Sequence, residues 1–306
     1  MEKINTLKNI LLIEDSCFNS SKYIKPNSVD MFFCDPPYNI LSGQKWDQQW
    51  KNNDEFYLWT KNWMKLMYEQ LKENGSAYIC ISWQHSFKFH LLLSELNFNI
   101  LNRITWKRDK GRGSLTNWKS MHEDIFFVSK SKDYLFNIDK VKIEKKVIAP
   151  YKDENGQNKD WWIDSEGNKI RLTYPGNLWE DFSVPFWSSN EVKSYAKSKK
   201  SLLNNLQKHP TQKPKDLVKR CILASTNEND LVVDYFLGSG TTLIASKELN
   251  RNGIGFEIDK NYCEIIKKRL QNENNLTHFD KIKNENKKNN KLKKGILGEG
   301  IFQEYK

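Results

Sequence analysis

The feature that most constrains this chain is the alternation of short apolar runs with stretches of helical periodicity. The apolar runs predict strands, which we place at residues 9–14, 29–34, 76–82, 100–106, 124–129, 231–234 and 253–257. Apolar residues at helical spacing predict helices at about residues 55–71, 87–96, from 214 onward, 241–249 and 260–270. Asp54 and Asp259 are expected to cap the helices that follow them, and Asn74-Gly75 to end the first helix. Strands that alternate with helices favour an α/β sheet in which parallel pairs dominate.

Residues 141–207 break this alternation. Gly, Asn, Asp and Lys are mixed there without sustained periodicity with four tryptophans, Trp161, Trp162, Trp179 and Trp187. We expect an inserted recognition module, in which the tryptophans fit a small core better than a base-stacking surface. The insert divides a catalytic domain into residues 1–140 and 208–271. Residues 272–306 are rich in Lys and Asn, which is typical of a solvated, flexible extension.

The net charge narrows the choice of partners. Lys and Arg number 49 against 38 Asp and Glu, which gives +11 and a pI near 9.2. This balance indicates a polyanionic partner, although a solvated lysine-rich surface explains it about equally well. No apolar run approaches the roughly 18 residues of a membrane-spanning helix, so no membrane partner is expected. The five cysteines are too far apart for a CxxC site, which favours reduced thiols and a cytoplasmic location.

The first chemical motif is Asp35-Pro36-Pro37-Tyr38, directly after the strand expected at residues 29–34. Ligands of open α/β sheets bind outside the carboxyl ends of the strands. The two prolines fix the backbone and remove two N–H donors, so the loop offers only a carboxylate and carbonyl oxygens, which suit an NH2 group. Tyr38 adds a flat face for stacking a base. The alternative is an ordinary proline turn.

The second motif extends from Asp234 to Thr242 and again combines a strand, a glycine turn and the start of a helix. Glycines let the backbone approach a ligand, and a helix start offers free N–H groups. The turn lacks the lysine of a phosphate-binding loop and the GxGxxG spacing of a dinucleotide fold. Glu257 ends the next strand, where an acid binds ribose hydroxyls in nucleoside sites. Unless this is a plain glycine turn, it predicts a nucleoside cofactor without a pyrophosphate.

These residues resemble the S-adenosylmethionine-dependent amino-methyltransferases that act on DNA. The catalytic motif precedes the cofactor motif, as in the circularly permuted β group of restriction–modification type, and the resemblance covers residues 9–271. The segment His209-Pro210-Thr211-Gln212-Lys213-Pro214 is similar to the family's element beside the methionine end of the cofactor. Tyr235 stands where the family usually has proline, and Glu14 where glycine is commoner.

The resemblance implies a doubly wound, mostly parallel seven-stranded sheet of the Rossmann-like methyltransferase type, with residues 141–207 as the target-recognition insert. S-adenosylmethionine is the implied cofactor, and a homodimer and a cognate restriction endonuclease are left open as partners. The implied catalytic residues are Asp35, Pro36, Pro37 and Tyr38. The implied cofactor-binding residues are Asp15, Ser16, Cys17, Asp35, His209, Pro210, Thr211, Lys213, Asp234, Phe236, Gly238, Ser239, Gly240, Thr241, Thr242, Glu257 and Ile258.

A basic loop follows the strand expected at residues 100–106. Between Asn102 and Ser120 there are six basic residues and one acid. Basic side chains in a glycine-bearing loop can reach phosphates and guanine edges, so we expect DNA contacts here, although a solvated loop is the alternative. The expected DNA-binding residues are Lys107, Arg108, Lys110 and Arg112. His122 has no second ligand at helical spacing, and no metal site is expected.

Together the motifs predict methyl transfer from S-adenosylmethionine to the exocyclic amino group of adenine in DNA. Asp35 and the Pro36 carbonyl would accept the hydrogens of that amino group, and the base must leave the duplex to reach them. Two alternatives remain open. One is an amino-cytosine methyltransferase of the same fold, a group that more often has Ser in place of Asp35. The other is a catalytically idle DNA-binding subunit.

Overall fold

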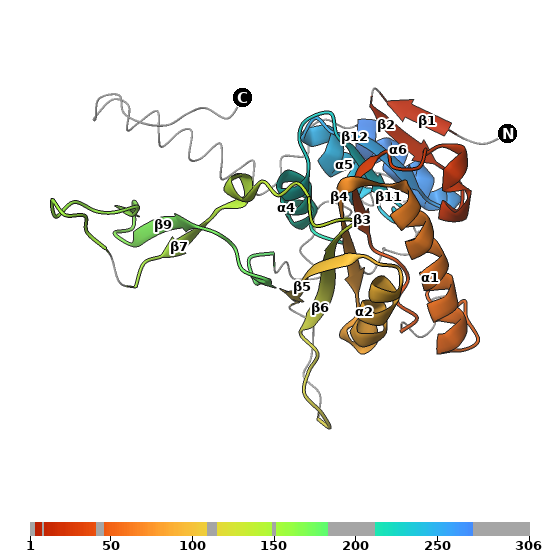
Figure 1. Ribbon diagram of the computed structural model, residues 1–306, viewed down its shortest axis with the longest axis horizontal. Helices are drawn as coiled ribbons and strands as arrows, with labels where there is room; N and C mark the ends of the chain where they lie inside the picture. Colours follow the sequence, from red (N-terminus) through yellow and green to blue (C-terminus); the bar gives the residue numbers. More distant parts are fainter. Residues whose placement is uncertain are drawn as a thin grey trace, which may run out of the picture. The chain divides into compact units, whose positions relative to one another are not determined.

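The computed structural model in Figure 1 describes residues 4–7, 9–40, 46–108, 115–148, 151–182 and 212–271. All elements discussed below belong to a compact unit that extends to Leu270, the penultimate residue of the last helix. The flexible extension expected at residues 272–306 lies outside the described residues. No helix in the described part of the chain is long and apolar enough to cross a membrane.

The core is a mixed α/β sheet, for which the described residues supply nine strands in the order β1-β2-β12-β11-β3-β4-β6-β5-β10. From β2 to β4 in this order every neighbouring pair is parallel, whereas β1 and β6 pair antiparallel with their neighbours. The bounds are β1 (Ile4–Leu7), β2 (Ile10–Ile13), β3 (Val29–Cys34), β4 (Leu71–Ile81), β5 (Asn99–Lys107), β6 (His122–Ser129), β10 (Leu178–Trp179), β11 (Leu231–Asp234) and β12 (Asn252–Phe256).

The strand count differs from the expected seven. The seven expected strands are all present, and β1 and β10 are additional. β1 extends the sheet edge as an antiparallel partner of β2, and the two-residue β10 pairs with β5 through Leu178 opposite Thr105. The two-residue β10 is too short to leave a recognisable alternation in the sequence, because a strand pattern needs about four or more residues. β1 has four residues, Ile-Asn-Thr-Leu, of which only the first and last are apolar, so it leaves no continuous apolar run.

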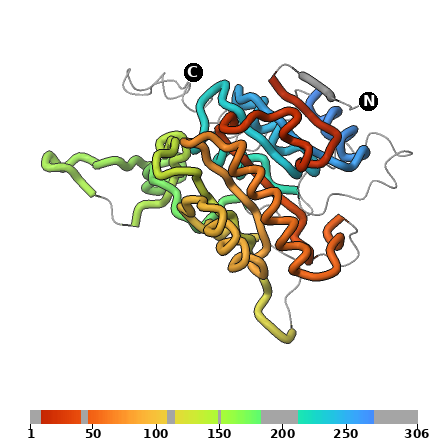
Figure 2. The backbone as a smooth tube through the Cα atoms, turned by 45° about the vertical axis from the view of Figure 1, so that its right-hand side comes forward, coloured from red at the N-terminus to blue at the C-terminus, as the bar shows by residue number. Residues whose placement is uncertain are grey.

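Helices enclose the sheet. β3, β4 and β6 are buried almost without interruption, which requires cover on both faces. α1 packs against α2, whereas α4 packs against α5 and against β3 and β4. Figure 2 shows the orange chain that contains α1 apart from the blue chain that contains α5 and α6. The bounds are α1 (Asn53–Gln70), α2 (Ser86–Glu95), α4 (Lys215–Ser225), α5 (Thr241–Glu248) and α6 (Lys260–Gln271), with single-turn helices at Cys17–Lys22, Trp83–His85 and Ile138–Val141.

The start and end of α1 differ from expectation. The capping side chain is Asn52, whose oxygen accepts from the Glu55 backbone N–H, and Asp54 lies inside the first turn. Asn52 has the extended backbone that an N-cap needs, and an acid in the first turn favours the helix dipole without capping it. The helix ends at Gln70, and Asn74-Gly75 lies inside β4. Asp259 does cap α6, since it accepts from the Asn261 backbone N–H at 2.7 Å.

The part of the insert that the structure describes is not a separate core built on tryptophan. β7 (Ile143–Lys146), β9 (Lys169–Thr173) and β8 (Trp162–Ile163) form a small antiparallel sheet. Trp162 is exposed on it, whereas Trp179 is buried where β10 joins the main sheet. Trp187 lies outside the described residues. The recognition role of the insert therefore stays a prediction.

Candidate active site

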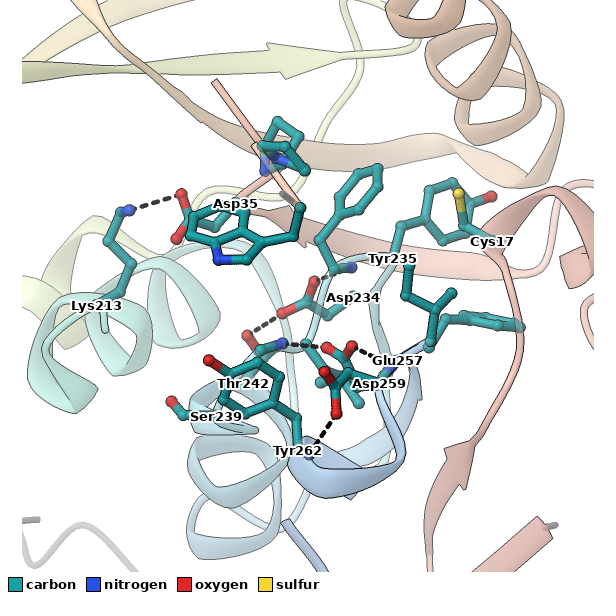
Figure 3. A pocket seen from close by; sticks show the side chains of 18 of the residues that line it. Cys17, Asp35, Lys213, Asp234, Tyr235, Ser239, Thr242, Glu257, Asp259 and Tyr262 are labelled. Carbon is teal, nitrogen blue, oxygen red and sulfur yellow. Dashed lines mark hydrogen bonds and ion pairs between the residues drawn. The ribbon is translucent and has the colours of Figure 1, made fainter. Parts of the chain in front are cut away.

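The two motifs meet at one cavity of about 410 Å³. β3 and β11 are parallel neighbours, with Val232 opposite Met31 and Val233 opposite Phe32, so the loops that follow them leave the same edge of the sheet. Figure 3 shows side chains of both loops around this cavity. The two motif-bearing strands therefore lie side by side, although their motifs are far apart in the sequence.

Asp35 is held in the first loop by two donors on a single oxygen. Its Oδ1 accepts from the Tyr38 hydroxyl at 2.7 Å and from Lys213 Nζ at 2.6 Å. The loop itself is fixed by the fully buried Asp47, whose carboxylate accepts from the backbone N–H groups of Asn39 and Ile40. Asp47 was not predicted from the sequence, because nothing in its neighbourhood shows which backbone groups it will bind.

Lys213 belongs to a buried cluster of charges that surrounds Asp35. Its Nζ lies 3.4 Å from Glu123 Oε2, and Glu123 in turn pairs with the Arg108 guanidinium. Side-chain exposure is 3% for Lys213, 5% for Glu123 and 15% for Arg108. Burial alone would lower the pKa of the Lys213 ammonium, but the carboxylates of Asp35 and Glu123 outweigh it and raise that pKa above its usual value. The cluster thus keeps a charged lysine in the protein interior.

Two of the expected site residues have partners within the protein in this cluster. Lys213 was expected beside the methionine end of the cofactor, but its ammonium is directed to Asp35 (Figure 3). Arg108 was expected on DNA, but it is paired with Glu123 and lies 4.5 Å from the centre of the Trp106 ring. Both cations are drawn inward because two buried carboxylates need compensation. Lys107 does remain exposed, paired with Glu180 at 3.1 Å.

The second side of the cavity holds two carboxylates that are bound by local groups. Asp234 is buried and accepts from the Phe236 backbone N–H at 2.8 Å and from the Thr242 hydroxyl at 2.6 Å. Glu257 accepts from the backbone N–H groups of Gly238 and Asp259, both at 2.8 Å. Burial raises the pKa of each carboxyl group to about 7. Neither group has a cation to offset its desolvation among the contacts that the structure shows.

The glycine turn contains two glycines with a left-handed backbone, Gly238 with φ +50° and Gly240 with φ +82°. Gly240 precedes the first residue of α5. A Cβ there would lie 2.8 Å from Cγ1 of Ile266, so both the backbone conformation and the packing of α6 require glycine. Tyr235, which replaces the family's usual proline, is buried and donates to Gln70 Oε1 at 2.6 Å. This substitution therefore fits the fold.

Most of the expected site residues lie at the cavity. Those that line it are Ser16, Cys17, Asp35, Pro36, Pro37, Tyr38, Lys213, Asp234, Phe236, Gly238, Ser239, Thr241, Thr242, Glu257 and Ile258. Gly240 and Asp15 are not among the lining residues. Gly240 shapes the turn between β11 and α5, and Asp15 accepts from the Ser16 backbone N–H and the Asn19 side chain within its own turn. His209, Pro210, Thr211, Lys110 and Arg112 lie outside the described residues.

The charge of the cavity selects the kind of ligand. Its described wall contains one cation, Lys213, against five acids, Asp35, Asp47, Asp234, Glu257 and Asp259. A ligand with phosphate groups would meet repulsion there, whereas a ligand with a positive charge and hydroxyl groups finds acceptors. Aromatic side chains such as Phe33 and Phe256 supply apolar wall for a flat ring. A nucleoside with a cationic sulfur fits these residues. The described residues contain no group of three metal-ligating side chains.

Known proteins are similar in sequence to this chain over most of its length. A model of the N6/N4 methylase family, described as DNA methylase, matches residues 29–268. The type II methyltransferase M.HpaI of Haemophilus parainfluenzae is 31% identical over 273 residues, which cover 89% of this chain and 76% of the relative. M1.MboII of Moraxella bovis is 35% identical, covering 81% and 91%. The DNA adenine methyltransferase YhdJ of Escherichia coli strain K12 is 32% identical, covering 85% and 82%.

Solved structures agree in fold. The PvuII DNA methyltransferase, titled cytosine-N4-specific, superposes with a TM-score of 0.63 at 18% identity, covering 88% of this chain and 89% of that one. The M1.HpyAVI complex with SAM superposes with a TM-score of 0.55 at 24% identity, covering 86% and 100%. The match to the family model and the relatives above 30% identity show that this chain belongs to the N6/N4 DNA methylase family.

Proposed function

We propose that this chain transfers the methyl group of S-adenosylmethionine to the exocyclic amino group of adenine in DNA, within a restriction–modification system. The observation that carries the proposal is the position of Asp35. It lines the cavity at the end of β3, next to β11 and, beyond it, β12. At the ends of those two strands lie Asp234 and Glu257, the acids expected to bind a nucleoside. The type II names of M.HpaI and M1.MboII support the restriction–modification setting, and with it a cognate endonuclease.

The second side of the cavity would hold the cofactor. S-adenosylmethionine supplies a reactive methyl group on a positively charged sulfur. Glu257 would accept hydrogen bonds from the ribose hydroxyls, since each carboxylate oxygen can accept more than the single backbone N–H it now binds. Asp234 and the other acids of the wall would stabilise the positive charge of the ligand. The complex of M1.HpyAVI with SAM shows that cofactor on the same fold.

Asp35 would act on the target base. A free oxygen of its carboxylate, together with the Pro36 carbonyl, would accept the hydrogens of the amino group and favour a nitrogen with a localised lone pair. Catalysis then depends on placing that nitrogen in line with the methyl group, without a covalent intermediate on the protein. Adenine is favoured over cytosine by the carboxylate at this position and by YhdJ, which is named for adenine.

The sequence predicts that Tyr38 stacks on the target base, but its contacts in the structure support a different role. Its ring is buried and its hydroxyl donates to Asp35, so it orients the carboxylate. The ring still lines the cavity and would border a base that has left the duplex. All five cysteines are buried free thiols, which supports a working compartment where thiols stay reduced.

Genomic DNA tests the proposal. The chain and its Asp35→Ala variant are expressed in a host without its own DNA methyltransferases, and the genome is sequenced with detection of modified bases. We expect N6-methyladenine at one recurrent short sequence, and no modification with the variant. Modification of cytosine at N4 would replace adenine as the target. Unmodified DNA from a protein that binds S-adenosylmethionine would favour the idle DNA-binding subunit.

A further inference from the structure

We propose that Lys213 and Glu123 are positioning residues for methyl transfer. Lys213 fixes one oxygen of Asp35 and leaves the other for the target amino group, and Glu123 holds Lys213 in that place. This inference rests on the proposed function, because it assigns the amino group to the second oxygen of Asp35. Neither role follows from the motifs in the sequence, in which Lys213 belongs with the cofactor and Glu123 with no motif.

Lys213 has three partners within the protein. An ammonium has three N–H donors, and Nζ lies 2.6 Å from Asp35 Oδ1, 3.1 Å from the Tyr38 hydroxyl and 3.4 Å from Glu123 Oε2. Two of these contacts are hydrogen bonds, to Asp35 and Tyr38, and the third is an ion pair with Glu123. All three partners belong to the protein, and two of them are carboxylates that compensate the charge of Lys213. Lys213 acts through Asp35, which it contacts directly.

The two oxygens of Asp35 are in different situations. Oδ1 accepts from both Tyr38 and Lys213, whereas Oδ2 receives no hydrogen bond within the part of the chain that the structure describes. The Asp35 side chain is 17% exposed and lines the cavity. Because two donors on one oxygen fix the rotation of the carboxylate, Oδ2 is presented in a single direction. That is the property an acceptor needs to orient an amino group for in-line attack.

Glu123 and Arg108 balance the charges around Lys213 and Asp35, which allows this ion pair to be buried. If Asp35 and Tyr38 were its only partners, the buried Lys213 ammonium would draw the Asp35 carboxylate toward itself. Its own lost hydration would also be poorly compensated. Glu123, from the start of β6, supplies a second carboxylate to Lys213, and Arg108, just after β5, balances the charge of Glu123. The cluster thus contains two carboxylates and two cations, and removal of one member leaves a buried charge without compensation.

A pH profile can report on the cluster because Asp35 must be ionised to accept the amino group. The charged and titratable groups that face Asp35 come from several elements. They are Tyr38 and Cys34 from its own strand and loop, Lys213 before α4, Glu123 from β6, Arg108 after β5, Asp234 from β11 and Cys80 from β4. Lys213 is the nearest cation, and Glu123 is the second carboxylate that Lys213 contacts.

The test is kcat for DNA methylation as a function of pH, at saturating S-adenosylmethionine and DNA, so that titration of the cofactor-side carboxyls does not enter. Lys213→Met removes the cation beside Asp35 and should move the acid limb of the profile up by about one to three pH units. The double variant Lys213→Met with Glu123→Gln also removes the repelling carboxylate and should return the limb toward wild type. Lys213→Arg keeps the charge and should leave the limb near its original position.

A matched control separates this role from loss of a buried ion pair in general. Glu248 binds the buried Lys215 and Lys219 of α4 but does not line the cavity. Glu248→Gln should therefore lower the melting temperature without moving the acid limb. Calorimetry should find the dissociation constant of S-adenosylmethionine within about threefold of wild type for the Lys213 and Glu123 variants.

Two results would overturn the inference. One is an acid limb that stays in place in Lys213→Met while cofactor affinity falls tenfold, because Lys213 would then bind the cofactor. The other is a double variant whose limb does not return. Failure of the proposed function looks different, since the wild-type protein itself would then methylate no DNA. If Lys213→Met does not fold, Glu123→Gln still decides. The inference requires this variant to lower kcat while the dissociation constant of S-adenosylmethionine stays within about threefold, and an unchanged kcat would overturn it.

Discussion

The two sides of the cavity hold their carboxylates by opposite means. On the Asp35 side, Asp35 and Glu123 face Lys213 and Arg108, which come from other strands and from the segment before α4. On the cofactor side, Asp234 and Glu257 accept from backbone N–H groups and from one hydroxyl, all of them near β11 and β12. The carboxylates of the Asp35 side are compensated by charged side chains, and those of the cofactor side only by neutral hydrogen-bond donors.

This difference indicates what each side does. A carboxylate that is neutralised within the protein keeps its geometry and its charge whether or not a ligand is bound. Carboxylates that are buried without a cation have a raised pKa, about 7 for both Asp234 and Glu257, and become fully ionised when a positive ligand arrives. The Asp35 side is therefore preorganised for chemistry, whereas the cofactor side is completed by its ligand.

The largest effect on methylation is expected from a substitution on the Asp35 side. Asp35→Ala removes the proposed acceptor of the target amino group, so methylation should fall by at least about 10²–10³-fold. The affinity for S-adenosylmethionine should stay within about threefold, because Glu257 and Asp234 are untouched. Single-turnover methylation and calorimetry measure the two quantities. A variant with turnover within tenfold of wild type would remove Asp35 from the catalytic step.

A substitution on the cofactor side should weaken cofactor binding and leave turnover at saturating cofactor largely unchanged. Glu257→Ala deletes charge-assisted hydrogen bonds to the ribose, which contribute roughly 1.5–3 kcal/mol, and should raise the cofactor dissociation constant about ten- to hundred-fold. At saturating cofactor, kcat should recover most of its original value. Calorimetry with Ser16→Ala as a milder cavity-wall control gives the comparison. An unchanged dissociation constant in Glu257→Ala would place the ribose elsewhere.

The two sides should also differ in pH dependence. In the free protein Asp234 and Glu257 hold their protons up to a pKa of about 7, above the ordinary values of 3.8 and 4.5. These groups bind more protons when folded, so their contribution to the free energy of unfolding falls as the pH rises from about 4 to 7. Cofactor binding favours the ionised forms and should tighten from pH 6 to pH 8 by about tenfold for each carboxyl group that loses its proton, or about a hundredfold for both.

Calorimetric titrations at several pH values check this expectation, with Glu257→Gln as the control that should flatten the dependence. Thermal unfolding of the free protein over the same range checks the opposite trend in stability. A dissociation constant that is independent of pH would contradict the contrast between the two sides, since it would mean that the cofactor side is already ionised without its ligand.

The smallest effects concern DNA and distinguish two neighbouring cations. Lys107 is exposed beside Glu180, so Lys107→Ala should weaken all DNA equally and reduce the slope of log affinity against log salt by about one. Arg108→Ala should lower kcat on every DNA sequence, because it removes one of the two cations that pair with Glu123 and leaves Lys213 as the other. Initial rates on cognate and non-cognate oligonucleotides measure both. A changed ratio between the two oligonucleotides in Arg108→Ala would restore Arg108 as a base-reading residue.

The sequence predicts the parts of this molecule that depend on neighbouring residues. The seven main strands and both motif turns follow from local apolar runs, glycines and prolines, and Glu257 from its place at a strand end. The cluster around Asp35 could not be predicted in this way, since Lys213 reaches Asp35, and Glu123 reaches Lys213, from segments far apart in the chain. Arg108 looks like a DNA-contacting residue in the sequence because a basic loop gives no sign of the carboxylate that binds it.

The central claim is that the Asp35 side of this cavity methylates adenine. The most direct test incubates the purified chain with duplex DNA and S-adenosylmethionine labelled in its methyl group, digests the DNA to nucleosides and identifies the labelled product by mass spectrometry. We predict labelled N6-methyldeoxyadenosine from the wild-type protein and none from Asp35→Ala under the same cofactor saturation. Label in N4-methyldeoxycytidine, or label in deoxyadenosine from the Asp35→Ala variant, would contradict the claim.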